Sequence, residues 1–247
     1  MKRAVPRAMF LGTTDYAHRG LHRLGTACVE NSLPAFTAAV EGGFGIECDV
    51  RLSADGIVFV FHDSTLDRLT AEHGRLVDRS AEALDAITLS GDGPIPRLST
   101  LLALVTGRVP LLIELKIDRG ERVAPLCRAV RDALADYAGP VAVMSFHPGV
   151  ARWFRTYAPD VPRGLVVTEE GGRGRWNAAR RSLAMRLVAP DFLAHDIRDL
   201  PGPFARLARR RGLPVLSWTV RTAQHWQTVR AYADAAIFEG EPPARHG

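Results

Sequence analysis

The feature that most constrains this chain is a regular alternation of short apolar runs with stretches of helical periodicity. A short apolar run predicts a buried strand, and apolar residues spaced three or four apart predict a helix. The predicted strands are 14–18, 44–50, 111–116, 141–146, 164–168, 191–195, 214–219 and 234–238. The predicted helices are 33–41, 98–107, 121–137, 148–157, 176–187, 203–211 and 222–231. Such alternation indicates a parallel sheet with right-handed crossover connections.

Eight strands alternating with helices in 247 residues fit an α/β fold of the (β/α)8 TIM-barrel type. Barrels of this kind routinely run 200–250 residues as one domain. A doubly wound open sheet is the main rival, but no Gly-rich G-x-G-x-x-G turn follows the first predicted strand. We therefore predict a single barrel domain over 1–247.

The alternation is interrupted once, after the second predicted strand. Residues 51–56 read RLSADG, and the pair Asp55-Gly56 is a strong turn signal. The next apolar run follows at once, whereas a parallel crossover needs a dozen or more residues. We expect 57–62 to return antiparallel as a hairpin, and 51–97 to form a small insertion within the barrel.

Composition narrows the class of protein and its partners. With 47% apolar and 24% charged residues the chain is an ordinary globular sequence. Its net charge of +5 is spread along the chain without interleaved aromatic residues, so we expect no nucleic-acid partner. There is no apolar run of 18 residues and no signal-peptide pattern at the N-terminus, so we expect a cytoplasmic protein without stable membrane insertion. The pattern leaves the oligomeric state open.

Three carboxylates are expected at one end of the barrel. Glu47 and Asp49 lie two apart on the second predicted strand, so both point to the same face. Glu114 occupies the third predicted strand. Like charges this close lose charge unless a cation neutralises them. Oxygen ligands alone indicate a hard ion, so we expect a divalent cation, Mg²⁺ or Ca²⁺, bound by these three residues.

Two positively charged side chains and two histidines are expected around this predicted metal site. Arg19 follows His18 at the end of the first strand, and Lys116 shares a face with Glu114. The chain has 30 Arg and only two Lys, so an internal Lys at this place indicates a need for a compact point charge. A positive charge beside a metal suits a phosphate that bridges the two. His18 and His62 then supply general acid and base.

Six short segments carry a resemblance to a known family. In order they are AHRG (17–20), ENSLPAF (30–36), GIECDV followed by DGIVFVFHD (45–63), LLIELK (111–116), SF (145–146) and SWTV (217–220). Together they resemble the glycerophosphodiester phosphodiesterase family over most of the chain, most closely over 17–70. Each piece alone is weak, but the combination H-R-G, E-x-D, H-D and E-x-K is specific.

The resemblance implies a (β/α)8 barrel with a small insertion, acting on a small phosphodiester substrate. The implied reaction is metal-dependent hydrolysis of glycerophosphodiesters to sn-glycerol 3-phosphate and an alcohol. The implied roles are His18 and His62 as the catalytic pair, Glu47, Asp49 and Glu114 as metal ligands, and Arg19 and Lys116 as phosphate contacts. Asn31, from the E-N-[ST] motif, is a further substrate-binding candidate. At the C-terminal strand the chain reads AIFEGEPP where the family often has Thr-Asp and then Pro, and Glu239 is the nearest substitute for that Asp.

Several alternatives remain open at this point. Trp218 is either a wall of the substrate site or a core aromatic residue. The attacking group is either water or a hydroxyl of the substrate, and either histidine can be the base. Rival functions are a phospholipase D-type or lysophospholipid-cleaving barrel, a metal-independent phosphatidylinositol-cleaving barrel, and a non-catalytic phosphodiester-binding barrel. The charged insertion favours a small water-soluble diester, while the head group is not indicated.

Overall fold

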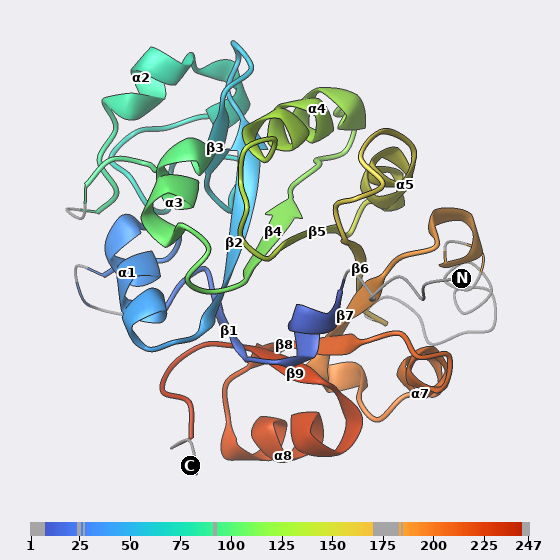
Figure 1. Ribbon diagram of the computed structural model, residues 1–247. Coiled ribbons are helices and arrows are strands. Elements are labelled where there is room, and N and C mark those ends of the chain that lie inside the picture. Colours follow the sequence, from blue (N-terminus) through green and yellow to red (C-terminus); the bar gives the residue numbers. More distant parts are fainter. Residues whose placement is uncertain are drawn as a thin grey trace. The chain divides into compact units, whose positions relative to one another are not determined.

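The computed structural model describes residues 8–23, 26, 28–90, 93–169, 183 and 185–243. The chain divides into two compact units, one of residues 17–141 and one of residues 1–16 with 142–247 (Figure 1). Within the described ranges, none of the helices has both the length and the apolar character that a membrane crossing needs.

The unit of residues 17–141 contains a parallel pair of strands flanked by a hairpin strand (Figure 1). Strand β2 pairs in parallel with β4 and antiparallel with β3. The first helix, α1, begins where the hydroxyl of Ser32 accepts a hydrogen bond from the amide of Ala35, and it has Pro34 in its first turn. The strands are β1 (Tyr16–His18, which begins in the other unit), β2 (Gly45–Leu52), β3 (Val58–Val60) and β4 (Leu111–Leu115). The helices are α1 (Leu33–Glu41), α2 (Ala81–Asp85), α3 (Leu98–Val105) and α4 (Val123–Ala133), with a 3-10 turn η2 (Leu76–Asp78).

The β2–β3 hairpin and the segment after it build a small core of their own. The amide of Ser53 donates to the carbonyl of Ile57 across the turn, and Gly56 supplies the positive φ of 90° that the turn requires. Buried side chains from β3 to the segment after α2 pack together as one cluster: Phe59, Phe61, Leu66, Leu69, Leu76, Ala81, Leu84, Ile87, Leu89 and Ile95. This packing fixes the segment that carries the predicted catalytic histidine of the hairpin.

The second unit holds five parallel strands in consecutive order, from β5 to β9. The strands are β5 (Val141–Ser145), β6 (Arg163–Val167), β7 (Phe192–Asp196), β8 (Val215–Val220) and β9 (Ala235–Phe238). The helices are α5 (Pro148–Tyr157), α7 (Pro203–Arg210) and α8 (Ala223–Tyr232), with 3-10 turns η1 (Met9–Gly12) and η3 (Ile197–Asp199). In Figure 1 the elements from β5 onward run from olive through orange to red, and η1, near the N-terminus, is dark blue.

The described strands and helices follow the predicted order. The helices predicted over 33–41 and 148–157 match α1 and α5 at both ends. The antiparallel return predicted for 57–62 is confirmed but is shorter, because only Val58–Val60 stay in the ladder. The predicted helix 121–137 is also shorter, as α4 covers Val123–Ala133. The helix predicted over 176–187 lies largely outside the described residues.

Candidate active site

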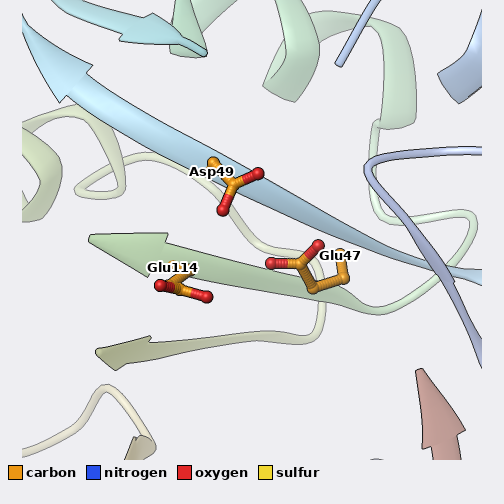
Figure 2. Close-up of side chains that lie close together, drawn as sticks. All are labelled: Glu47, Asp49 and Glu114. Carbon is orange, nitrogen blue, oxygen red and sulfur yellow. The ribbon is translucent and has the colours of Figure 1, made fainter. Parts of the chain in front are cut away.

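The predicted carboxylates of β2 and β4 come together in the structure. Glu47 and Asp49 point to one face of β2, and Glu114 on β4 lies in register with Asp49. All three are buried, and one oxygen of each lies within 4.8 Å of the others. Figure 2 shows the three side chains directed into the same space from two neighbouring strands. This arrangement is the oxygen-lined cluster that the alternation of residues predicts.

The protein does not fully neutralise the charges of this carboxylate cluster. Burial raises the pKa of Glu47 well above its ordinary value, and the charges of Asp49 and Glu114 add to the rise. Burial, followed by Asp49, also raises the pKa of Glu114 against the opposing effect of Lys116. Among the described residues, none donates a hydrogen bond to the buried Oε1 of Glu47. Three buried carboxylates with an unsatisfied oxygen fit a hard divalent cation such as Mg²⁺ or Ca²⁺.

Lys116 lies against the carboxylate cluster, as predicted from its place beside Glu114. Its ammonium nitrogen is 3.0 Å from Oδ1 of Asp49 and 2.7 Å from Oε1 of Glu114. Burial acts to lower the pKa of Lys116, but the two carboxylates outweigh it and raise that pKa. Burial likewise acts to raise the pKa of Asp49, which Lys116 and Arg19 hold well below its ordinary value.

Arg19 reaches the same cluster from the end of β1. Its Nε lies 3.2 Å from Oδ2 of Asp49, and its backbone amide donates to Oε2 of Glu47. Its Nη1 donates to Oε1 of Glu30 at 2.6 Å. The backbone of Arg19 is left-handed, with φ of 58°, which turns the chain so that amide and side chain both face the carboxylates. Two of its contacts therefore stabilise the proposed metal ligands.

Asn31 holds Asp49 by both ends of its amide. Its Nδ2 donates to Oδ2 of Asp49 at 3.0 Å, and its Oδ1 accepts from the amide of Asp49 at 3.3 Å. The backbone amide of Asn31 donates to the backbone carbonyl of Arg19. Asn31 is buried, so these contacts fix a proposed ligand rather than face solvent. Its predicted contact with substrate stays a prediction.

The two predicted catalytic histidines flank the cluster. Nε2 of His18 lies 3.8 Å from Oε2 of Glu47. His62 follows β3, and its Nδ1 lies 2.6 Å from Oδ1 of Asp63. The amide of Phe61, the residue before His62, donates to the carbonyl of Asp49 at 2.9 Å. Burial lowers the pKa of His62, while the charge of Asp49 acts to raise it. The hairpin has therefore brought His62 back toward the strand that supplies the ligands.

Trp218 belongs to the other unit of the chain. Its indole Nε1 donates to the carbonyl of Ala194 on the neighbouring strand at 2.9 Å. Its ring meets that of Phe146 edge to face, with centroids 5.4 Å apart. Both contacts lie within its own unit, so its role as a wall of the substrate site stays a prediction.

Sequence reasoning missed a second set of residues that hold His62. Buried Arg51 donates from Nε to the backbone carbonyl of His62 at 2.9 Å and pairs with Asp118. Arg68 donates to Asp63, which in turn contacts the imidazole. The position of Asp63 directly after His62 was an available clue. Neither arginine could be singled out in a chain with 30 of them.

With this geometry in hand, the comparison with known proteins decides the family. The model of the glycerophosphoryl diester phosphodiesterase family matches residues 18–242, which span both the site and the strands that follow it. The chain belongs to the glycerophosphoryl diester phosphodiesterase family. It is therefore grouped with the phosphoric diester hydrolases, as its resemblance implied.

Individual relatives agree with this family assignment. A glycerophosphodiester phosphodiesterase of Caldanaerobacter subterraneus subsp. tengcongensis is 29% identical over 241 residues, which cover 92% of this chain and 94% of the relative. The glycerophosphodiester phosphodiesterase 1 of Bos taurus is 39% identical over 226 residues, covering 78% of this chain and 68% of the relative.

Solved structures of the phosphodiesterase family share the fold. A phosphodiesterase of Oleispira antarctica, solved with the product sn-glycerol-3-phosphate, superposes with a TM-score of 0.78 at 22% identity, covering 91% of this chain and 92% of that one. A glycerophosphodiester phosphodiesterase of Thermotoga maritima gives 0.74 at 24% identity, covering 91% of this chain and 93% of that one. The prediction of a (β/α)8 barrel is thereby confirmed.

Proposed function

We propose that this chain hydrolyses glycerophosphodiesters to sn-glycerol 3-phosphate and an alcohol, with a divalent cation held by Glu47, Asp49 and Glu114. The observation that carries the proposal is the buried three-carboxylate cluster flanked by two histidines, in a chain of this family. The Oleispira antarctica phosphodiesterase was solved with sn-glycerol-3-phosphate, which supports a product of the same kind here.

The cation is proposed to act as a Lewis acid. Glu47, Asp49 and Glu114 would hold Mg²⁺ or Ca²⁺, and the bound cation would supply Lewis-acid polarisation of a phosphoryl oxygen. Asn31 keeps Asp49 in place through two hydrogen bonds, and the backbone amide of Arg19 does the same for Glu47. These contacts fix the directions of the ligand oxygens before a cation binds.

Arg19 and Lys116 are proposed to stabilise charge on the phosphoryl group. Both side chains already lie against carboxylate oxygens of the cluster, so a phosphate beside a bound cation falls within their reach. Charge-assisted hydrogen bonds from them grow stronger as negative charge develops on the non-bridging phosphoryl oxygens. Their contribution is then larger in the transition state than in the bound substrate.

His18 and His62 are proposed to carry the proton transfers. One histidine removes the proton from the attacking oxygen, and the other gives a proton to the leaving alkoxide. For His62, the contact of Nδ1 with Asp63 leaves Nε2 as the nitrogen for this exchange. The attacking oxygen belongs either to water or to the 2-hydroxyl of the substrate glycerol, which would give a cyclic phosphate that water then opens.

A substrate panel tests this proposed function. The purified protein is offered glycerophosphodiesters and lysophospholipids with Mg²⁺, Ca²⁺, Mn²⁺ or a chelator, and sn-glycerol 3-phosphate is measured. We expect its release from small diesters with metal and none with chelator. Activity that resists the chelator would instead support a metal-independent barrel. Cleavage confined to lysophospholipids would support a lipid-cleaving enzyme, and no cleavage under any metal would contradict the proposal.

A further inference from the structure

Arg68, in the insertion after β3, bridges two carboxylates that sequence reasoning had not assigned to the site. Its Nε and Nη2 donate to Oδ2 and Oδ1 of Asp63 at 2.6 and 3.1 Å. Its Nη1 and Nη2 donate to Oε2 and Oε1 of Glu30 at 2.9 and 2.7 Å. One guanidinium therefore holds two carboxylates, each through a pair of hydrogen bonds. A lysine ammonium could not do this, because it lacks the planar fork of donors.

Each of these carboxylates also contacts a residue of the proposed active site. Oε1 of Glu30, which accepts from Arg68, also accepts from Nη1 of Arg19 at 2.6 Å. Oδ1 of Asp63, which accepts from Arg68, also lies 2.6 Å from Nδ1 of His62. The five side chains form one continuous network, with Arg68 at its centre and a proposed phosphate contact and a proposed catalytic base or acid at its two ends.

The charges of this network suit an orienting role. Burial acts to raise the pKa of Asp63, but hydrogen bonds from Arg68 and His62 outweigh it and lower that pKa to about 2. Asp63 is therefore a carboxylate at neutral pH and can only accept a hydrogen bond from the imidazole. Nδ1 of His62 then carries a proton, and Nε2 is the nitrogen left for proton transfer. Glu30 is likewise ionised, because its two arginine partners outweigh the effect of burial.

From this geometry we infer that Arg68 is a positioning residue of the active site, which sets the orientation of His62 through Asp63 and of Arg19 through Glu30. Its side chain is about half exposed at 47%, whereas Glu30 is 10% exposed, so Arg68 closes the network from the solvent side. The guanidinium of Arg68 pairs with the carboxylates of Glu30 and Asp63. Only the catalytic consequence of this inference rests on the proposed function.

Kinetics of matched arginine variants test this inference. We expect Arg68→Gln to lower kcat by about 10²-fold, the loss typical of a misplaced catalytic group, with KM changed less than about threefold. Arg68→Lys keeps the charge but not the fork, and we expect it to recover less than about a tenth of the lost rate. Arg131→Gln removes another partly exposed arginine paired with an aspartate, Asp132, and serves as the control. A kcat of Arg68→Gln equal to that of the control would overturn the inference.

Coupling between positions separates orientation from simple stabilisation of the fold. If Arg68 acts through Asp63, the double variant Arg68→Gln/Asp63→Asn should be no slower than the slower single variant. Losses that multiply instead would mean that the two residues act independently, which contradicts the inference. Guanidinium added to Arg68→Ala is expected to restore part of kcat at millimolar concentration while leaving the Arg131→Ala control unchanged. Absence of any rescue, together with multiplying losses, would count against a positioning role.

A spectroscopic readout needs no turnover and keeps the two proposals apart. Ring ¹⁵N resonances of His62, assigned by their loss in His62→Gln, report which nitrogen carries the proton in the neutral ring. We expect a protonated Nδ1 in the unmodified protein and a mixture of tautomers in Arg68→Gln. Unchanged resonances would overturn the inference even in an active enzyme. If no diester is hydrolysed by the unmodified protein, the proposed function fails, while these resonances still decide whether Arg68 orients His62.

Discussion

The ammonium group of Lys116 lies 3.0 Å from Oδ1 of Asp49, and both groups are largely removed from solvent. The contact joins a residue of the β4 end to a proposed metal ligand of β2. In a chain that otherwise uses arginine almost throughout, the compact ammonium fits where a guanidinium would crowd the carboxylates. Lys116 thus balances part of the cluster's charge and remains close to where a substrate phosphate is proposed to bind.

Replacing Lys116 tests both proposed roles, which are to balance the charge of the carboxylate cluster and to contact the substrate phosphate. We expect Lys116→Met to lower kcat/KM by about 10²–10³-fold, the loss typical of removing one charge-stabilising donor. Lys116→Arg is not expected to restore the rate, because the larger planar group does not fit the same buried space. The matched control is Arg119→Met, at an exposed position in the loop after β4. Steady-state hydrolysis of a glycerophosphodiester measures the effect, and a fully active Lys116→Arg would contradict the fit argument.

The carboxylate cluster predicts a cation-dependent gain in stability. A cation that binds only the folded protein raises the free energy of unfolding by about 2.7 kcal/mol at a hundredfold excess over its Kd. We expect Mg²⁺ or Ca²⁺ to raise the Tm of the unmodified protein, and a chelator to reverse the rise and abolish turnover. Glu47→Gln should bind the cation more weakly, while Glu82→Gln, at an exposed position of α2, should behave as the unmodified protein. An equal Tm rise in Glu47→Gln would argue that the cation binds elsewhere.

The two histidines are expected to matter for rate and not for folding. General acid–base catalysis contributes about 10²–10⁴-fold, so His18→Ala and His62→Ala should each lower kcat by a factor in that range. Circular dichroism and Tm should stay close to those of the unmodified protein. His73→Ala removes a highly exposed histidine of the insertion that pairs with Asp67, and serves as the control. Near-normal turnover of His62→Ala would remove it from the mechanism.

The low pKa of Asp63 predicts a pH-dependent contribution to stability. Its folded value of about 2 lies below the ordinary value of 3.8, so its ion pairs stabilise the fold above about pH 4 and are lost as the pH falls toward 2. We expect Asp63→Asn to be less stable than the unmodified protein by about 1 kcal/mol at pH 6, allowing for solvent screening, with the difference shrinking between pH 4 and 2. Urea unfolding at several pH values measures this difference. A difference that stays constant across that range would show that the charge of Asp63 is not its source.

Much of the fold could be predicted because its periodicities are local. Apolar runs and helical spacing correctly predicted both ends of α1 and of α5, and the Asp55-Gly56 pair correctly indicated the hairpin. The insertion was harder, since its short helix α2 and its 3-10 turn η2 each contribute only one or two buried residues to a cluster assembled from the whole segment. The observed ends of the strands also differ from the predicted ends, because a ladder of hydrogen bonds ends where the partner strand ends.

The candidate active site likewise contains residues that local patterns predicted and residues that only the tertiary structure brings together. Alternation along β2 predicted that Glu47 and Asp49 share a face, but the register that sets Glu114 beside Asp49 depends on how two distant strands pair. The network around Arg68 joins positions 30, 63 and 68, which no spacing rule connects. Its members are ordinary charged residues in sequence, and their meeting is a property of the tertiary structure.

The turn of the hairpin sets a fixed length of chain between the proposed metal ligands of β2 and His62. Its carboxylate Asp55 accepts from Ser53 and from the first amide of α2, which ties the tip of the hairpin to the insertion. Beyond the turn, the amide of Phe61 donates to the carbonyl of Asp49. One residue added or removed in 53–57 would displace His62 by about 3.3 Å and turn its side chain to the other face. The number of residues in this turn therefore cannot change without moving His62 relative to the proposed site.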